Sequence, residues 1–189
     1  PKGVPKQLKN TTIPFDYNNL QSLQKIIKDH DIGIIKMEVS RTYAPKNNYL
    51  ESVREIADKN NIILIFDECT SGFRETYGGL HKKYKVYPDM MMLGKTLGNG
   101  YAITAVLGKS EIMKAAEETF ISSTFWTERI GPTAALKTLE VMEKEKSWEI
   151  ITKIGKRISK HWTFLAKKYD LPIKVRGLHA LTNFEIISN

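Results

Sequence analysis

Two ionisable residues each follow a short apolar run, at the point where the run ends. Residues 62–66 lead into Asp67, and residues 90–94 lead into Lys95. Short apolar runs that are bounded by turn residues and separated by helical stretches are typical of buried strands in a parallel sheet, with both faces covered. Because the carboxyl ends of parallel strands meet at one edge, where open α/β sheets bind ligands, we expect Asp67 and Lys95 to share a site.

A carboxylate facing a lysine at such an edge suits the chemistry of pyridoxal 5′-phosphate (PLP). In that chemistry a lysine forms a Schiff base with the cofactor, and an aspartate keeps the pyridine nitrogen protonated. Each residue alone has a simpler interpretation, because Lys95 could be a solvated loop residue and Asp67 a polar strand end or a helix cap. The surrounding residues favour the functional interpretation.

A longer pattern of residues surrounds Asp67 and Lys95. Residues 67–74 read Asp-Glu-Cys-Thr-Ser-Gly-Phe-Arg, and Tyr-Gly-Gly, Pro-Asp and Leu-Gly-Lys follow at 77–79, 88–89 and 93–95. This order and spacing resembles the class III PLP-dependent aminotransferase family, most closely its glutamate-1-semialdehyde 2,1-aminomutase branch. The resemblance has no gaps from residue 62 to about 113, and it continues more loosely from residue 37 to residue 178.

The resemblance implies roles for the two ionisable residues. Lys95 would carry the Schiff base and move a proton between substrate and cofactor, and Asp67 would pair with the pyridinium nitrogen. Burial of Lys95 at the sheet edge would lower its pKa, so that its amine is available near neutral pH. Gly94-Lys95-Thr96 also resembles the end of a P-loop, but position 89 holds Asp where that motif needs glycine. We therefore reject a nucleotide-hydrolase function.

The resemblance also implies a threonine that binds the cofactor phosphate of a neighbouring subunit, five residues before a proline. Counting back from Pro132 gives Thr127, whereas the local Ser-Thr-Phe pattern gives Thr124. We favour Thr127 because it needs no insertion, although a threonine here could equally cap the helix expected from about Glu128. The family's Gly-Asn before the proline is replaced by Ile-Gly at 130–131, which argues for a different substrate.

The resemblance implies PLP-dependent transfer of an amino group between a small-molecule donor and acceptor, in a homodimer with a shared active site. Arg74 and Arg129 are candidates to bind a substrate carboxylate, although Arg74 is more simply explained by an ion pair with a neighbouring acid. One alternative is the intramolecular amino shift of glutamate-1-semialdehyde 2,1-aminomutase. Alternatives of another class are a non-catalytic fragment and a basic nucleic-acid-binding domain.

The apolar periodicity predicts an α/β fold with alternating helices and strands. The predicted helices are 19–29, 49–60, 131–143 and an amphipathic helix over 148–169, and the predicted strands are 32–37, 62–66, 90–94, 173–176 and 181–187. By resemblance this is the large domain of a fold type I PLP-dependent transferase, a mainly parallel sheet flanked by helices. Residues 1–145 would belong to that domain, 146–172 would form a connecting helix and 173–189 would begin a small C-terminal domain. Because family members are more than twice as long, we expect the chain to be a fragment.

Composition limits the partners and the location. The chain has 189 residues, 41% of them hydrophobic, and a formal net charge of +8. Basic residues between 144 and 176 alternate with an apolar stripe and accompany no zinc-finger or RNA-binding motif, so we expect no nucleic-acid partner. No apolar stretch is long enough to span a bilayer, and the four histidines lack metal-ligand spacing. The single cysteine, Cys69, excludes an intrachain disulfide and favours a reducing, cytoplasmic location.

Overall fold

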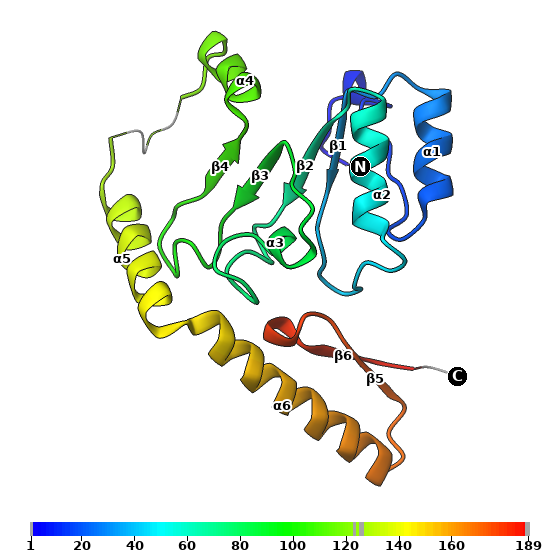
Figure 1. Ribbon diagram of the computed structural model, residues 1–189, viewed down its shortest axis with the longest axis vertical. Helices are drawn as coiled ribbons and strands as arrows, with labels where there is room; N and C mark the ends of the chain where they lie inside the picture. The colour runs from blue at the N-terminus through cyan, green and yellow to red at the C-terminus, as the bar shows by residue number, and fades with distance from the viewer. Residues whose placement is uncertain (1, 123, 125–126, 188–189) are drawn as a thin grey trace.

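A four-stranded sheet organises the first part of the chain (Figure 1). The computed structural model describes residues 2–122, 124 and 127–187. The sheet contains, in spatial order, β1 (Ile34–Met37), β2 (Ile63–Asp67), β3 (Met90–Leu93) and β4 (Ala105–Gly108). Strands β1 to β3 are parallel, and β4 runs antiparallel to β3. The predicted α/β fold with a mainly parallel sheet is therefore confirmed, and β4 is an antiparallel edge strand that the sequence pattern did not reveal.

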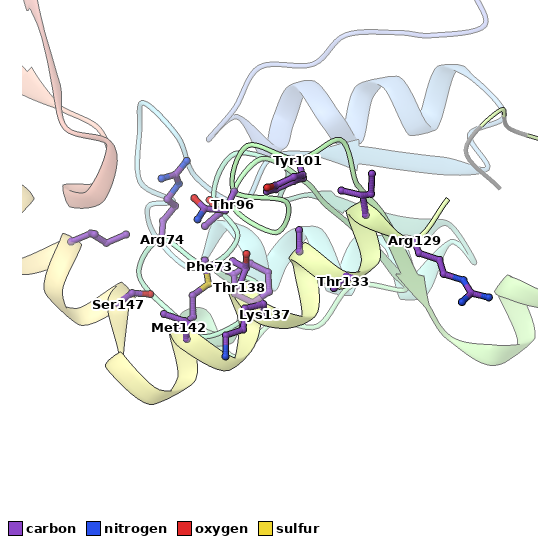
Figure 2. Close-up of a pocket in the computed structure, with 15 residues that line it drawn as sticks. Phe73, Arg74, Thr96, Tyr101, Arg129, Thr133, Lys137, Thr138, Met142 and Ser147 are labelled. Carbon is purple, nitrogen blue, oxygen red and sulfur yellow. The ribbon is translucent and has the colours of Figure 1, made fainter. Parts of the chain in front are cut away.

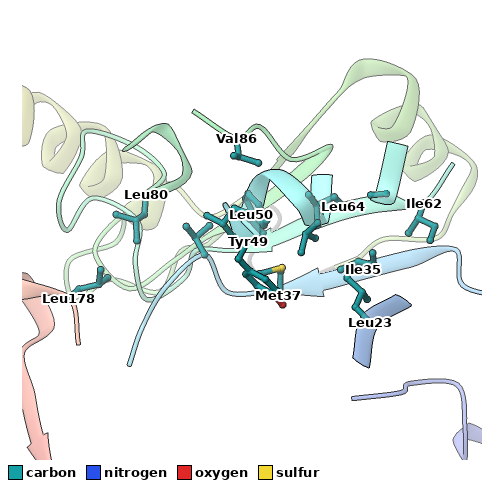
Figure 3. Close-up of a cluster of buried hydrophobic side chains, with 14 residues drawn as sticks. Leu23, Ile35, Met37, Tyr49, Leu50, Ile62, Leu64, Leu80, Val86 and Leu178 are labelled. Atoms are coloured by element: carbon teal, nitrogen blue, oxygen red, sulfur yellow. The ribbon is translucent and has the colours of Figure 1, made fainter. Parts of the chain in front are cut away.

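Helices α1 (Leu20–Asp29) and α2 (Tyr49–Lys59) cover one face of the sheet. The side chain of Asn19 accepts a hydrogen bond from the amide of Ser22 at 3.0 Å, which caps the start of α1. Figure 3 shows the apolar cluster that these helices form with the strands. The cluster joins buried side chains of both helices to those of β1 and β2, among them Leu23, Leu50, Ile35, Leu64 and Phe66.

The other face of β1 and β2 is more open. Ile35 and Met37 are buried, whereas the alternating residues Ile34 and Lys36 are exposed. The same alternation occurs in β2, where Asp67 lies on the half-buried face. The expectation that both faces are covered is therefore wrong for these strands, because in the described residues α1 and α2 pack only on the face that carries Ile35 and Met37.

Four short elements complete this part of the chain. The 3₁₀ helix η1 (Lys6–Leu8) precedes α1, and α3 (His81–Tyr84) lies between β2 and β3. Helix α4 (Ser110–Met113) and the 3₁₀ helix η2 (Lys114–Glu118) follow β4. Helix α5 (Ile130–Glu145) then packs Ala135 and Met142 against Phe73, Leu93 and Leu97. This second cluster holds the segment after β3 against α5.

Helix α6 (Ser147–Lys168) carries a small antiparallel hairpin of β5 (Ile173–Arg176) and β6 (Asn183–Ile186), with the 3₁₀ helix η3 (His179–Leu181) between them. The long helix was predicted at 148–169. Its predicted apolar stripe is only partly packed, since Ile154 and Leu165 are exposed. Helix η3 approaches α6 closely over Gly155, where a Cβ atom would lie 1.7 Å from the His179 carbonyl oxygen. Among the helices of the described ranges, none is long and apolar enough to cross a membrane.

Candidate active site

Asp67 is the last residue of β2, and its carboxylate is held from two sides. Oδ2 lies 3.0 Å from the Nζ atom of Lys36 on β1, and Oδ1 accepts a hydrogen bond from the backbone amide of Cys69 at 3.2 Å. Burial acts to raise the pKa of Asp67, but the bonds from Lys36 and Cys69 outweigh it, so the pKa lies below its usual value. The structure thus places an ionised carboxylate at the end of β2.

Lys95 follows β3 after a single glycine and lies at the same edge of the sheet. Its backbone has a φ of +39°, in the left-handed region, and its Nζ atom donates to the hydroxyl of Thr70 at 2.5 Å. Because residues 67–70 are consecutive, this bond brings Lys95 to the segment that begins with Asp67. The expected burial of Lys95 is wrong, since the residue is exposed at the open end of the strands.

Glu68 anchors the loop that carries these contacts. Its side chain is fully buried, and its Oε1 atom lies 2.6 Å from Nδ1 of His81. Oε1 also accepts from the His81 amide at 3.1 Å, while Oε2 accepts from the Ser71 hydroxyl at 3.1 Å and from the amide of Leu80. The carboxylate therefore ties the start of α3 back to the end of β2.

Cys69 lies near both the acid and the amine, whose charges act on its thiol. Its thiol is half-buried and packs beside Gly94, whose substitution would place a Cβ atom 3.3 Å from Sγ. Burial and the neighbouring Asp67 carboxylate raise the pKa of the thiol, and Lys95 partly opposes them. The thiol therefore has little tendency to ionise and acts mainly as a space-filling group.

The two candidate phosphate-binding threonines, Thr124 and Thr127, are exposed and lie in the chain between η2 and α5. Asp67 ends β2, which β3 separates from the edge strand β4. Glu128, rather than Thr127, bonds the first amides of α5, with a distance of 3.0 Å from Oε2 to the Gly131 nitrogen.

A cavity of about 850 Å³ lies between α5 and the turn after β3, and neither Asp67 nor Lys95 lines it (Figure 2). Arg74 and Arg129 both line it, and Figure 2 shows their guanidinium groups on opposite sides. The suggested ion pair of Arg74 with an acid is wrong for the described residues, since its Nε atom donates to the Thr70 carbonyl at 3.3 Å. Burial lowers the pKa of Arg74.

The acid and the amine at the strand ends lie within a stretch that is similar to known proteins. Residues 38–189 match the family described as aminotransferase class-III. The chain belongs to this family. The match confirms the family that the residues around Asp67 and Lys95 predicted.

Curated relatives of this class III chain include both aminotransferases and aminomutases. A 3-aminobutyryl-CoA aminotransferase of Cloacimonas acidaminovorans is 36% identical over 184 residues, which cover 93% of the chain and 44% of the relative. A glutamate-1-semialdehyde 2,1-aminomutase of Saccharolobus islandicus is 34% identical over 163 residues, which cover 82% of the chain and 38% of the relative. The chain therefore spans less than half the length of these relatives.

A solved structure shows the same fold. The PLP internal aldimine form of the FumI protein from Sphingopyxis sp. MTA144 superposes with a TM-score of 0.86 at 23% identity, over 91% of the chain and 44% of the FumI protein. At this identity the similarity supports the fold alone. Within the ranges that the structure describes, no group of three His, Cys, Asp or Glu side chains could hold a metal ion.

Sequence reasoning missed two residues of this candidate site, Lys36 and Glu68. Lys36 could have been noticed as the single charged residue inside the apolar run of β1, next to the strand that ends in Asp67. Glu68 gave no such signal, because its burial depends on the fold of the loop up to His81. Lys36 contacts Asp67 from outside the pattern that identified the pair, whereas Glu68 belongs to that pattern and anchors the loop between them.

Proposed function

We propose that this chain carries the lysine and aspartate of a PLP-dependent aminotransferase, which moves an amino group from a small-molecule donor to the carbonyl carbon of an acceptor. The donor is left as a carbonyl compound. The observation that supports this most strongly is that Asp67 and Lys95 meet at one strand edge through the 67–70 segment.

The residues at this edge fit PLP in charge and accessibility. The Asp67 carboxylate is ionised and its side chain is 28% exposed, so it can face a protonated pyridine nitrogen. The Nζ atom of Lys95 is accessible to an aldehyde. It donates a hydrogen bond to the hydroxyl group of Thr70. When bound, PLP supplies an electron sink for bond breaking at the substrate carbon.

The two residues would then divide the work. Asp67 holds the ring nitrogen in its protonated form by charge, since a carboxylate favours a nearby cation. Lys95 holds the cofactor and, once released by an incoming amine, moves a proton at its Nζ atom. The Thr70 hydroxyl would hold the free Lys95 amine close to this edge through its hydrogen bond.

Transfer between two molecules is favoured over an intramolecular shift by the comparison with the Cloacimonas enzyme. That relative is named an aminotransferase and matches 93% of this chain. Its name also suggests a substrate class, amino-acyl thioesters. A competition assay on the full-length protein between 3-aminobutyryl-CoA and glutamate-1-semialdehyde tests this, because turnover of glutamate-1-semialdehyde alone would support the aminomutase instead.

We further propose that the protein is a homodimer in which Thr127, or alternatively Thr124, binds the cofactor phosphate of the neighbouring subunit. Both residues are exposed and follow β4 in the chain, so they are accessible to a neighbouring subunit. Mixed dimers test this sharply. Lys95→Ala and Thr127→Ala subunits, each inactive alone, should regain activity when mixed, and the same experiment with Thr124→Ala distinguishes the two threonines. The proposed division at residues 145 and 172 into a large domain, a connecting helix and a small domain can be tested by limited proteolysis.

Trapping of the cofactor tests the central proposal. The chain is incubated with PLP, reduced with borohydride and analysed by peptide mass spectrometry. We expect the label on Lys95, with little on Lys36, the other amine at this edge, and its loss in Lys95→Ala. Scattered labelling that is unchanged in the variant would contradict the proposal and favour a non-catalytic role or, if binding to nucleic acid falls steeply with salt, a nucleic-acid-binding role.

A further inference from the structure

We propose that Lys36 is a positioning residue of this site, which holds the Asp67 carboxylate through an ion pair before cofactor binds and competes with the protonated ring nitrogen for it afterwards. This inference rests on the proposed function. It concerns a residue that the family pattern around Asp67 does not include.

The register of the sheet explains how Lys36 reaches Asp67. Lys36 lies directly opposite Ile65 in the parallel pairing of β1 and β2. Side chains two residues apart on a strand point to the same face, so Ile65 and Asp67 share a face with Lys36. The lysine side chain extends along this face by two residues, about 6.6 Å at a rise of about 3.3 Å per residue, and places Nζ 3.0 Å from Oδ2.

Other groups around Asp67 do not take the place of this cation. The opposite strand β3 presents Met92 to Asp67, and the following loop offers the Cys69 amide to Oδ1. Lys95 is engaged by the Thr70 hydroxyl. Among the described residues, the ion pair of Asp67 is therefore made with Lys36, and it occupies the oxygen that the amide leaves free.

A second cation at this carboxylate has a definite consequence. The Lys36 ammonium and a protonated ring nitrogen repel each other and share one negative charge, so removing Lys36 leaves Asp67 free for the ring. Exposed ion pairs in water contribute at most about 1 kcal/mol. Such a free energy corresponds to at most about a fivefold change in the affinity for PLP. We therefore expect Lys36→Met to bind PLP up to about fivefold more tightly at pH 7.

The matched control is another lysine–aspartate pair at the opposite end of the strands. Lys109 lies 2.7 Å from Asp89, and its side chain is 53% exposed, against 51% for Lys36. Lys109→Met removes the same charge from the protein but leaves the site edge unchanged. Lys36→Arg keeps the charge beside Asp67 and serves as the conservative variant.

Two measurements on these variants test the proposal. The first is titration of the Asp67 carboxyl by carbon NMR without cofactor: its pKa should rise in Lys36→Met and stay low in Lys36→Arg and Lys109→Met. The second is the dissociation constant of PLP at pH 7, which should fall only in Lys36→Met. Unchanged or weaker PLP binding in Lys36→Met, or an unchanged Asp67 titration, would overturn the proposal.

The proposed function and the proposed role of Lys36 would be contradicted by different results. If the unmodified chain does not trap PLP on Lys95, the proposed function fails, whatever the titration shows. If PLP is trapped on Lys95 and Lys36→Met behaves as the Lys109→Met control, the proposed function stands and the role of Lys36 is wrong. Because Lys36 is half exposed, its replacement should leave the fold intact, which circular dichroism checks.

Discussion

Replacement of Glu68 by glutamine should destabilise the protein strongly although it changes only one atom. Each carboxylate oxygen accepts one backbone amide, Oε2 that of Leu80 and Oε1 that of His81. Each also has a second partner that can reverse its hydrogen bond, the Ser71 hydroxyl on Oε2 and the imidazole Nδ1 on Oε1. The backbone amides cannot reverse theirs.

The expected magnitude follows from this arrangement. In Glu68→Gln, whichever oxygen becomes an amide nitrogen, one buried backbone N–H then faces another donor. An unsatisfied buried donor costs about 1–3 kcal/mol. Because Glu68 has no exposed surface and water cannot replace its partners, we expect a loss of about 1–3 kcal/mol in the free energy of unfolding.

Urea denaturation followed by circular dichroism measures this loss. The control is Lys137→Met, which breaks the exposed pair of Lys137 with Glu140 and should change the free energy of unfolding by less than about 1 kcal/mol. The loop of Glu68 also carries Thr70, so borohydride trapping on Lys95 should be less efficient in Glu68→Gln. A loss below about 1 kcal/mol would show that the buried carboxylate is not the anchor inferred here.

Three further predictions concern other parts of the chain. Gly155→Ala should lower the free energy of unfolding by about 1–3 kcal/mol, measured by urea denaturation, because the new Cβ atom would meet a backbone oxygen. Gly33→Ala, with open space around its Cβ atom, should leave that free energy unchanged. Burial acts to raise the pKa of Asp89, but hydrogen bonds from the Leu64 amide, Lys109 and Arg54 outweigh it, so the pKa is lowered. The stabilisation from these bonds is therefore present above the unfolded pKa of about 3.9. It is lost as the pH falls through the folded pKa. Asp89→Asn should therefore flatten the acid limb of a stability–pH curve. Cys69 should react with iodoacetamide at pH 7 more slowly than a free thiol, as its raised pKa requires.

The strand ends could be predicted from the sequence because they are marked by strong local contrasts. An apolar run that stops at a charged residue identifies where β2 ends, and the glycine before Lys95 identifies the turn after β3. The meeting of Asp67 and Lys95 at one edge then followed from the parallel order of the strands. The positions of the strand ends and their shared edge follow from the direction of the chain, so they can be predicted without knowledge of side-chain packing.

Features that depend on long-range packing escaped the same reasoning. The residues of β4 (Ala105–Gly108) are few and end in glycine, so the strand exists through its pairing with β3 rather than through its own propensity. The predicted strand at 181–187 is shortened to Asn183–Ile186, because the chain first makes the turn of η3 against α6. The exposure of Lys95 likewise depends on what covers the strand ends.

The open face of β1 and β2 connects these findings to the site. A strand covered on both faces could not carry Lys36 in its middle, because an ammonium group buried there would lose its hydration. With one face open, the same strand places an apolar side chain toward α2 and a charged one toward Asp67. The alternation that contradicted the expected two-sided burial is therefore what allows a lysine on β1 to reach the acid on β2. On this reasoning, the charge balance of the candidate site is set by the pairing register of two strands as much as by the family pattern around Asp67 and Lys95.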